Sequence, residues 1–282
     1  MKKEEIRDRI HDQFKKIDKY FQKMVSDFEF EDIHRFRTET KRLRSFLHLL
    51  EMEKEEGIHF NTARKLKTVY GYAGIIRNLQ IQISTLKESL PEGQYPNNYL
   101  AKLKGELEDW KAKVREYMDT DNNFLDEEAL ILEKLPDKLR KKSIRQFIQF
   151  CMFKLSGLLK GLHEDENIHE FRKIMKDIYY NRSCLEYYMT NLPSGISDRY
   201  AAKAAIDMLG RFHDNCVALA MLKTYNDESI GNLQEKEILE KLEAKWEREK
   251  QIIKEKASAK LNLLHISTDS IKLVTFVDTT YQ

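Results

Sequence analysis

Basic side chains recur at helical spacing within one short stretch of the chain, IHRFRTETKRLRSFLHLL, residues 33–50. The row consists of His34, Arg37, Lys41, Arg44 and His48. Their intervals alternate between three and four residues, so in an α-helix they lie on one face. At about 1.5 Å per residue the row would be about 21 Å long. Arginine forks and lysine ammonium groups suit phosphate oxygens, and a row of this length suits a polymer rather than a nucleotide.

An apolar row runs beside the basic one in the same stretch. It consists of Ile33, Phe36, Thr40, Leu43, Leu47 and Leu50, with the threonine as its one polar member. Because each residue turns a helix by about 100°, the basic row flanks the apolar row instead of lying opposite to it. The sequence therefore predicts a helix with one side in a core and the neighbouring side along a groove that favours anions.

The same pattern occurs a second time in the chain. The segment NIHEFRKIMKDIYYNRSCLE, from Asn167, matches DIHRFRTETKRLRSFLHLLE, from Asp32, in the frame I-H-x-F-R-x-x-x-K. Its basic row consists of His169, Arg172 and Lys176. The segments VYGYAGIIRNLQ (69–80) and AIDMLGRFHDNC (205–216) also share a glycine followed by polar residues. An internal repeat of this kind predicts two related halves whose basic rows face a shared groove.

Helical periodicity covers nearly all of the 282 residues, which include only 10 Gly and 4 Pro. We expect eight long helices, at 3–26, 31–54, 60–90, 97–118, 137–162, 166–191, 196–226 and 229–262. Long helices joined by short loops favour an all-α fold of two pseudo-symmetric four-helix bundles. The predicted parts of this single domain, 1–282, are the halves 1–120 and 137–265, an acidic connection at 121–136, and a tail at 266–282. The tail could be a short strand, because its residues are β-branched and alternate in polarity.

The distribution of charge favours an anionic partner more than the net charge of +2 does. Residues 57–87 and 138–163 contain several Lys and Arg but no Asp or Glu. In 229–262, by contrast, acids and bases alternate as on a solvated helix face. Like charges at this density repel one another, so we expect an anion to compensate them.

Several classes of protein are disfavoured by the sequence. No segment approaches the about 18 consecutive apolar residues of a membrane span, and residues 1–14 lack the apolar core of a signal peptide. Cys151, Cys184 and Cys216 fit reduced core thiols of a cytoplasmic protein. The basic helices offer almost no carboxylates to hold a metal for phosphoryl transfer, and no Walker, H-E-x-x-H or paired C-x-x-C motif occurs. We expect a binding protein without metal or cofactor rather than an enzyme.

The motifs resemble the CHAD family, the conserved histidine α-helical domain. The first motif continues as I-H-x-F-R-x-x-x-K-R-L-R, and the segments 76–81 (IRNLQI) and 209–222 (LGRFHDNCVALAML) resemble further parts of that family. The resemblance spans residues 3–260. It implies two four-helix bundles related by a pseudo-two-fold axis, whose basic residues line a central surface that binds inorganic polyphosphate. The E-x-E-x-K strand of the triphosphate-tunnel domain, to which family members are often fused, has no match, so the chain resembles the binding module alone.

The resemblance also implies which residues bind polyphosphate. They are His34, Arg37, Lys41, Arg42, Arg44, Arg77, Lys141, Arg145, His169, Arg172, Lys173 and Lys176. The second motif departs from the family pattern, because Tyr179 stands where an arginine is usual and Asp177 where a base is usual. We therefore expect weaker binding by the second half. If His34 and His169 contact the anion, affinity should be higher at about pH 6 than at about pH 8.

Two other partners fit the basic rows. Phosphate contacts also dominate binding of RNA or single-stranded DNA, but such binders present exposed aromatic rings as well. Tyr179 and Tyr180 are the best candidates for such rings, whereas Phe36 and Phe147 follow the core period. An acidic protein is the other alternative partner. Polyphosphate, which carries charge without bases, best matches a basic row without stacking partners, and its granules in the cytoplasm are one location that this ligand allows.

Overall fold

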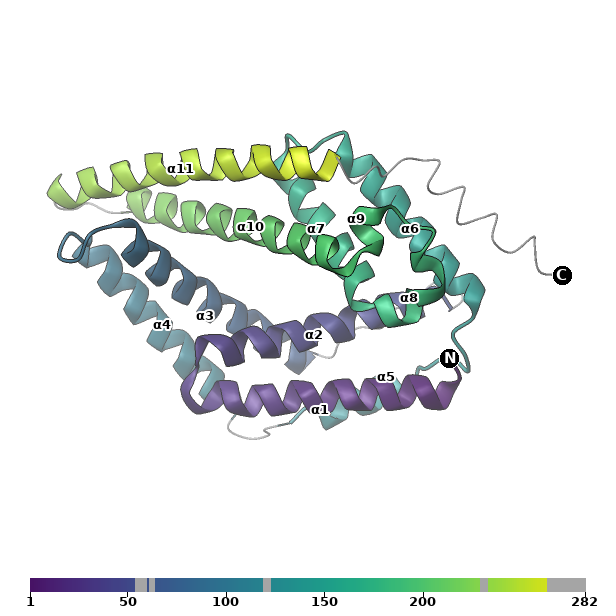
Figure 1. Ribbon diagram of the computed structural model, residues 1–282. Coiled ribbons are helices and arrows are strands. Elements are labelled where there is room, and N and C mark those ends of the chain that lie inside the picture. Colours follow the sequence, from purple (N-terminus) through teal and green to yellow (C-terminus); the bar gives the residue numbers. More distant parts are fainter. Residues whose placement is uncertain (54–59, 61–63, 119–122, 229–232, 263–282) are drawn as a thin grey trace.

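The computed structural model describes residues 1–53, 60, 64–118, 123–228 and 233–262 (Figure 1). The long helices of the first half are α1 (Lys3–Asp27), α2 (Phe30–Glu51), α3 (Arg64–Ser89) and α4 (Asn97–Tyr117). Those of the second half are α6 (Lys141–Leu159), α7 (Asp165–Tyr180), α10 (Arg199–Glu228) and α11 (Leu233–Asn262). Three short helices complete the described part, namely α5 (Leu125–Leu132), α8 (Arg182–Met189) and α9 (Ser194–Ser197). The predicted all-α fold is thus confirmed; the predicted tail at 266–282 lies outside the described residues.

The two halves pack in the same order (Figure 1). In the first half α1 packs on α2, α2 on α3, and α3 on α4. In the second half α6 packs on α7, α7 on α10, and α10 on α11. Between the halves, α2 contacts its counterpart α7, and α3 contacts its counterpart α10. Equivalent helices therefore meet at the centre of the molecule, which is the arrangement that a pseudo-two-fold axis produces.

Hydrophobic contacts join the halves into one structure. The larger core extends from Ile6 in α1 to Leu261 in α11 and includes Phe36 and Phe171, the phenylalanines of the two motifs. A second core joins α3 and α4 to α10 and α11. Its largest side chain is the fully buried Trp246, whose Nε1 donates a hydrogen bond of 2.9 Å to Ser89 Oγ in the other half.

One predicted helix is interrupted. The sequence predicted a continuous helix over 166–191, but α7 ends at Tyr180 and α8 begins at Arg182. Asn181 lies between them, is 1% exposed, and donates from Nδ2 to Ser45 O at 2.8 Å and to Ser45 Oγ at 2.9 Å. The prediction is wrong at this point because the packing of α2 against α7 gives the asparagine amide partners outside its own helix, which helical periodicity does not reveal.

The acidic connection between the halves contains α5. Two of its acids, Glu127 and Glu128, are buried, and His11 Nδ1 of α1 lies 2.7 Å from Glu128 Oε1. The three cysteines are free, and burial raises the pKa of the Cys151 thiol. Among the described helices, none combines the length and apolarity that crossing a membrane requires.

Candidate anion-binding site

The apolar row of α2 fixes the orientation of its basic row. All six members of the predicted apolar row, including Thr40, are buried. Thr40 Oγ1 donates to Phe36 O at 2.9 Å, so its hydroxyl is satisfied within the helix. Arg37 and Lys41, about one residue's turn away from this row, are half-buried. Core packing thus holds the basic row at the edge of the interior, where charges are less well solvated.

Arg37 lies in a space that α3 leaves open. Its Nη1 donates to the carbonyl oxygen of Tyr70 at 2.7 Å, and its guanidinium carbon lies 4.3 Å from the centre of the Tyr70 ring. A Cβ atom at Gly74 would overlap with Arg37 Nη1. The glycine that both halves share in this segment is therefore required for close approach of the arginine to the helix.

Arg172 occupies the equivalent place in the second half. It lies against Gly210 of α10, where a Cβ atom would be 3.1 Å from Arg172 Nη2. Its Nε is buried and has no hydrogen-bond partner within the described part of the chain. A buried N–H without a partner costs stability, so a ligand that accepts from it gains a contact that the free protein lacks.

Five cations from three helices form what we call the central cluster. They are Arg37 and Lys41 of α2, Arg77 of α3, and Arg172 and Lys176 of α7. Burial, together with the charges of Lys176, Arg37 and Arg172, lowers the pKa of Lys41 to about 6. Burial and the charge of Arg172 lower the pKa of Lys176 to about 8. The predicted rows of the two halves thus meet at one place.

Asp214 of α10 is a carboxylate that interacts electrostatically with four of these five cations. Burial raises its pKa, and the charges of the cations oppose that shift, with Arg172 and Arg77 the strongest. Asp207 lies two turns earlier in α10, and its charge also raises the pKa of Lys176. Its carboxylate already forms an ion pair of 2.6 Å with Lys203 Nζ. The central cluster therefore keeps a surplus of positive charge.

Three histidines lie around the central cluster and are predominantly neutral at pH 7. Burial lowers the pKa values of His34 and His169, and it lowers that of His213 to about 4. At His34, the charge of Arg77 also lowers the pKa. The rings of His169 and His213 have centres 4.6 Å apart, and the buried His169 Nδ1 has no partner among the described residues. These histidines can gain a proton when an anion arrives.

Other predicted binding residues lie outside the central cluster. Arg44 is exposed and its guanidinium is 5.6 Å from the Tyr70 ring, at the edge of the cluster. Arg42 projects from another side of α2, where its Nη1 is 2.6 Å from Glu39 Oε1. Lys173 is exposed and binds Glu170 at 2.7 Å.

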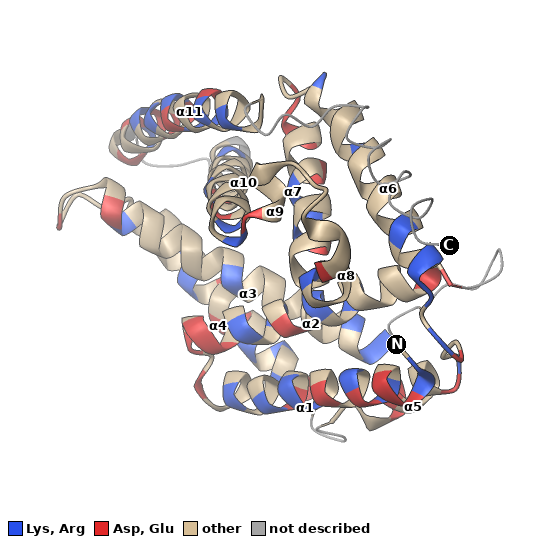
Figure 2. Ribbon diagram, turned by 45° about the vertical axis from the view of Figure 1, so that its right-hand side comes forward, with Lys and Arg blue, Asp and Glu red and all other residues tan. Residues whose placement is uncertain are grey.

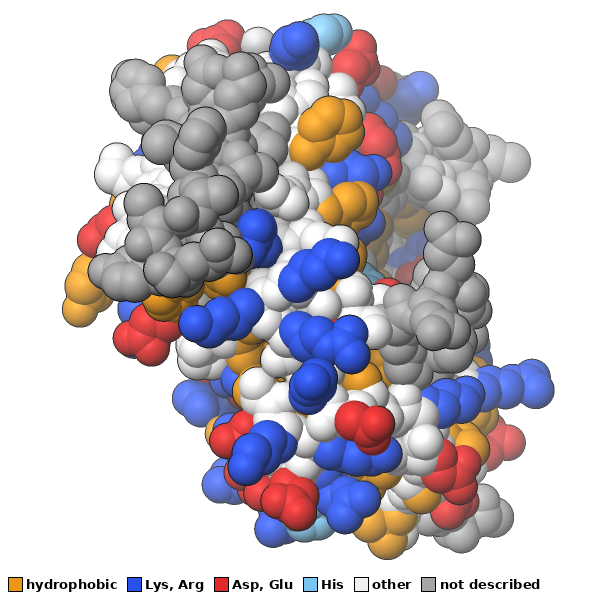
Figure 3. Space-filling view, turned by 90° about the vertical axis from the view of Figure 1, so that its right-hand side faces the viewer, with side chains coloured by type: hydrophobic (Ala, Val, Ile, Leu, Met, Phe, Trp, Pro, Cys, Tyr) orange, Lys and Arg blue, Asp and Glu red, His pale blue; other side chains and the backbone are white. Residues whose placement is uncertain are grey.

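The two predicted residues of α6 belong to a different surface. Lys141 Nζ is 5.0 Å from the centre of the Tyr187 ring in α8, and Arg145 is half-buried one turn further along α6. Figure 3 looks at the end of the molecule that carries α6 and the N-terminus, and it shows Lys and Arg side chains gathered there. In Figure 2, α1 and α11 instead carry both signs of charge along their lengths.

The departure of the second motif at Asp177 has a structural explanation. Asp177 Oδ2 lies 3.3 Å from His48 Nδ1, and Ser45 Oγ donates to the backbone oxygen of Asp177 at 3.2 Å. The hydrogen bond to Asp177 raises the pKa of His48. Where α2 crosses α7, Asp177 thus pairs with His48, the last member of the basic row. His48 therefore does not line the central cluster.

Comparison with known proteins agrees with this arrangement of helices. The family model described as the CHAD domain matches residues 8–223, which is most of the chain. The chain belongs to the CHAD family. A solved structure titled "Crystal structure of the CHAD domain from the plant Ricinus communis" is similar to it, with a TM-score of 0.59 at 14% identity over 95% of this chain and 89% of that chain. No curated protein matches.

Sequence reasoning missed three residues at the centre of this CHAD domain. Asp214 and His213 were not among the predicted site residues, although they act on the central cluster from α10. Tyr70 was not singled out, although its ring and carbonyl oxygen hold Arg37. The signal that could have found them is the glycine shared by 69–80 and 205–216, because a glycine within a long helix marks a close approach.

Alanine at Gly74 should destabilise this CHAD domain, whereas alanine at Gly71 should stabilise it. Gly71 lies in the same helix with nothing within 4 Å of a Cβ atom, so Gly71→Ala should gain about 0.5 to 1 kcal/mol of helix propensity. Gly74→Ala displaces Arg37 from the Tyr70 carbonyl, which should cost about 1.5 to 3 kcal/mol and reverse the sign. Urea unfolding of both variants measures this difference, and equal stabilisation by both would contradict the described position of Arg37.

Proposed function

We propose that this CHAD domain binds inorganic polyphosphate at the central cluster. The observation that carries the proposal is the convergence of five half-buried cations from α2, α3 and α7, four of which act on the carboxylate of Asp214. Burial and their mutual repulsion lower the pKa values of the two lysines, so an anion that enters gains attraction and relieves that repulsion. The family resemblance implies polyphosphate as this anion.

The aromatic residues near the cluster favour polyphosphate over single-stranded nucleic acid. Arginine side chains already lie over the Tyr70 ring, with Arg37 at 4.3 Å and Arg44 at 5.6 Å. Tyr180 is half-buried, and Arg42 lies 5.8 Å from its ring centre. Nucleobases need ring faces on which to stack, and in this site guanidinium groups occupy those faces. A ligand that offers phosphates without bases fits such a surface.

Binding rather than catalysis is the activity that this site favours. Phosphoryl transfer commonly uses carboxylates that hold metal ions beside the phosphates. Within the described part of the chain, no three or more His, Cys, Asp or Glu side chains are grouped as a metal site would require. The central cluster instead surrounds one carboxylate with cations. We propose a non-catalytic polyphosphate-binding protein that acts in the cytoplasm, with polyphosphate granules as a natural place of action.

A salt titration with two polyanions tests the proposal. Wild-type protein is titrated with long-chain polyphosphate and with single-stranded RNA of matched charge, at several NaCl concentrations. We expect tighter binding of polyphosphate at every concentration. A slope of log K against log salt of about −3.5 is expected if five cations contact phosphates, since single strands release about 0.7 ions per contact.

Each other outcome has a distinct meaning. Equal or tighter binding of RNA would identify a nucleic-acid-binding protein. No binding of either polymer by the folded protein would refute the proposed function and leave an acidic protein as the partner to search for.

A further inference from the structure

A hollow lies between α1 and α2, near the central cluster. Its volume is about 450 Å³, within the range of ligand-binding clefts. The residues that line it are Lys16, Lys19, Tyr20, Glu31, His34, Arg35, Thr38, Glu39 and Arg42. Eight of these nine side chains carry a charge or a small polar group, and the ninth is a tyrosine. The hollow is therefore polar and is built to hold a charged ligand rather than an apolar one.

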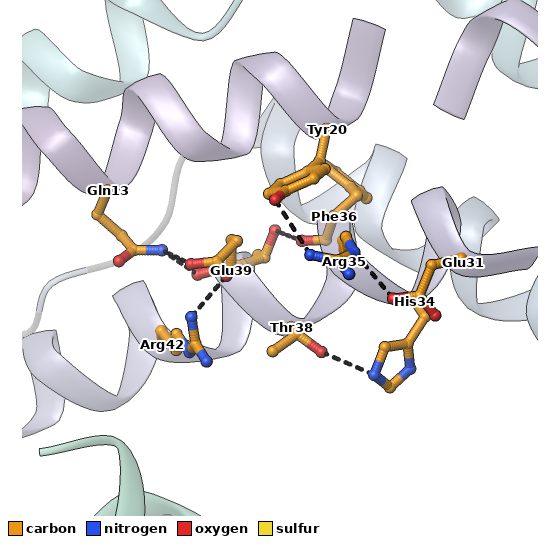
Figure 4. A network of polar contacts seen from close by, with 10 residues as sticks. Gln13, Tyr20, Glu31, His34, Arg35, Phe36, Thr38, Glu39 and Arg42 are labelled. Carbon is orange, nitrogen blue, oxygen red and sulfur yellow. Dashed lines mark hydrogen bonds and ion pairs between the residues drawn. The ribbon is translucent and has the colours of Figure 1, made fainter. Parts of the chain in front are cut away.

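Both carboxylates of the hollow are already bound by the protein, as Figure 4 shows. Glu31 Oε1 accepts from Arg35 Nε at 2.8 Å. Glu39 is buried and accepts from Arg42 Nη1 at 2.6 Å and from Gln13 Nε2 at 2.7 Å. Because each carboxylate is neutralised by an arginine of its own helix, neither leaves a free negative charge that would repel an anion.

Two lysines of α1 give the hollow its surplus charge. Lys16 and Lys19 are exposed, stand three residues apart and so project from adjacent turns of α1. Within the part of the chain that the structure describes, neither ammonium group has an ion-pair partner, and Lys19 Nζ is 5.8 Å from the Tyr20 ring. With four cations and two carboxylates around it, the hollow has a net charge of about +2.

His34 connects the hollow to the central cluster. It lines the hollow, and burial together with the charges of Arg77, Lys41 and Lys176 of the central cluster lowers its pKa. Its Nε2 lies 3.5 Å from Thr38 Oγ1, and Figure 4 shows both side chains pointing to the same side of α2. His34 is therefore the residue that the hollow and the surroundings of the central cluster have in common.

We propose that the hollow between α1 and α2 is a second anion subsite, which binds the continuing part of the polyphosphate chain and makes the protein selective for long linear chains. This inference rests on the proposed function of the central cluster. A short polyphosphate fills the central cluster alone. A long chain gains the contacts of Lys16 and Lys19 in addition.

The test compares two ligands and two variants. Tripolyphosphate and a chain of about 50 phosphates are titrated into wild type, into Lys16→Ala/Lys19→Ala, and into Lys236→Ala/Lys241→Ala. The last variant removes two exposed lysines from α11 and so makes the same change in net charge. We expect the α1 variant to lose about 10-fold in affinity for the long chain, with a salt slope shallower by about 1.4, and less than about 2-fold for tripolyphosphate. The α11 variant should bind both ligands as wild type does, within about 2-fold.

Three results would overturn the inference while leaving the proposed function standing. They are an unchanged affinity of the α1 variant for the long chain, an equal loss for both ligands, and an equal loss in the α11 variant. If wild type binds neither ligand, the proposed function fails and the inference fails with it.

Discussion

Replacing Arg172 and Lys176 by alanine should weaken the binding of long-chain polyphosphate about 100-fold, and replacing Arg37 and Lys41 should weaken it by a similar factor. A hydrogen bond from a charged donor to phosphate contributes about 1.5 kcal/mol or more, and two of them account for two powers of ten. Similar losses are expected because both pairs belong to one half-buried cluster in which each charge acts on the others. Isothermal titration at fixed salt measures the affinities.

The control for this comparison lies on α11. The variant Lys241→Ala/Arg248→Ala removes one lysine and one arginine from exposed positions, and its affinity should stay within about 3-fold of wild type. Thermal unfolding verifies that each variant folds. A large loss for Arg37→Ala/Lys41→Ala with a small loss for Arg172→Ala/Lys176→Ala would contradict the similar losses expected here and agree with the expectation from the sequence that the second half binds more weakly.

Affinity for polyphosphate should fall about 10- to 100-fold between about pH 6 and about pH 8. In the free protein the pKa of Lys41 is about 6, so most of this side chain is neutral at pH 7. A bound polyanion raises that pKa, and binding then takes up a proton throughout the interval between the free and bound values. Each proton taken up lowers the affinity by up to about tenfold per pH unit as pH rises. Lys176, with a pKa of about 8, adds to the effect at the upper end of the range.

Lys41→Arg separates this effect from the titration of the ligand itself. Arginine stays charged over the whole range, so the variant should bind more tightly than wild type at about pH 8 and lose much less affinity from about pH 6 to about pH 8. The remaining dependence belongs to Lys176, to the neutral histidines His34 and His169, and to the phosphate ends. A flat profile in wild type would contradict the burial of a neutral lysine at the centre.

The same lysine should lower the stability of the free fold at neutral pH. Its pKa in the folded protein, about 6, lies below the ordinary value of 10.5. The unfolded chain therefore binds more protons between these two values, and the contribution of Lys41 to the free energy of unfolding grows as pH rises through that window. Bound polyphosphate removes this penalty because it favours the charged form.

The core and the two basic rows were predictable because both follow the helical period. Ile33, Phe36 and Leu43 were predicted to belong to an apolar row, and all three are buried. The repeat of the motif predicted that Arg172 and Lys176 flank an equivalent apolar row. What joins the rows is the contact of α2 with α7 and of α3 with α10. The approach of the two rows could be predicted from the internal symmetry alone, whereas a shared groove that binds an anion stays a prediction.

The rest of the site depends on contacts between helices, which periodicity does not encode. Asp214 enters the cluster from α10, and Asn181 interrupts a predicted helix because Ser45 of the other half gives its amide a partner. Lys16 and Lys19 were missed because α1 mixes acids with bases and therefore reads as a solvated face. Only the packing of α1 on α2 shows that these two lysines border a hollow, where neither has an ion-pair partner among the described residues.

The contact between Ser45 and Asn181 also bears on the origin of the chain. In the repeat Ser45 corresponds to Tyr180, and Asn181 corresponds to Phe46. A homodimer of the first half would place a phenylalanine where the amide now donates to Ser45, and a homodimer of the second half would lack the serine that accepts it. Duplication and fusion of an ancestral half therefore allowed each copy to diverge, and neither modern half can rebuild this junction with a second copy of itself.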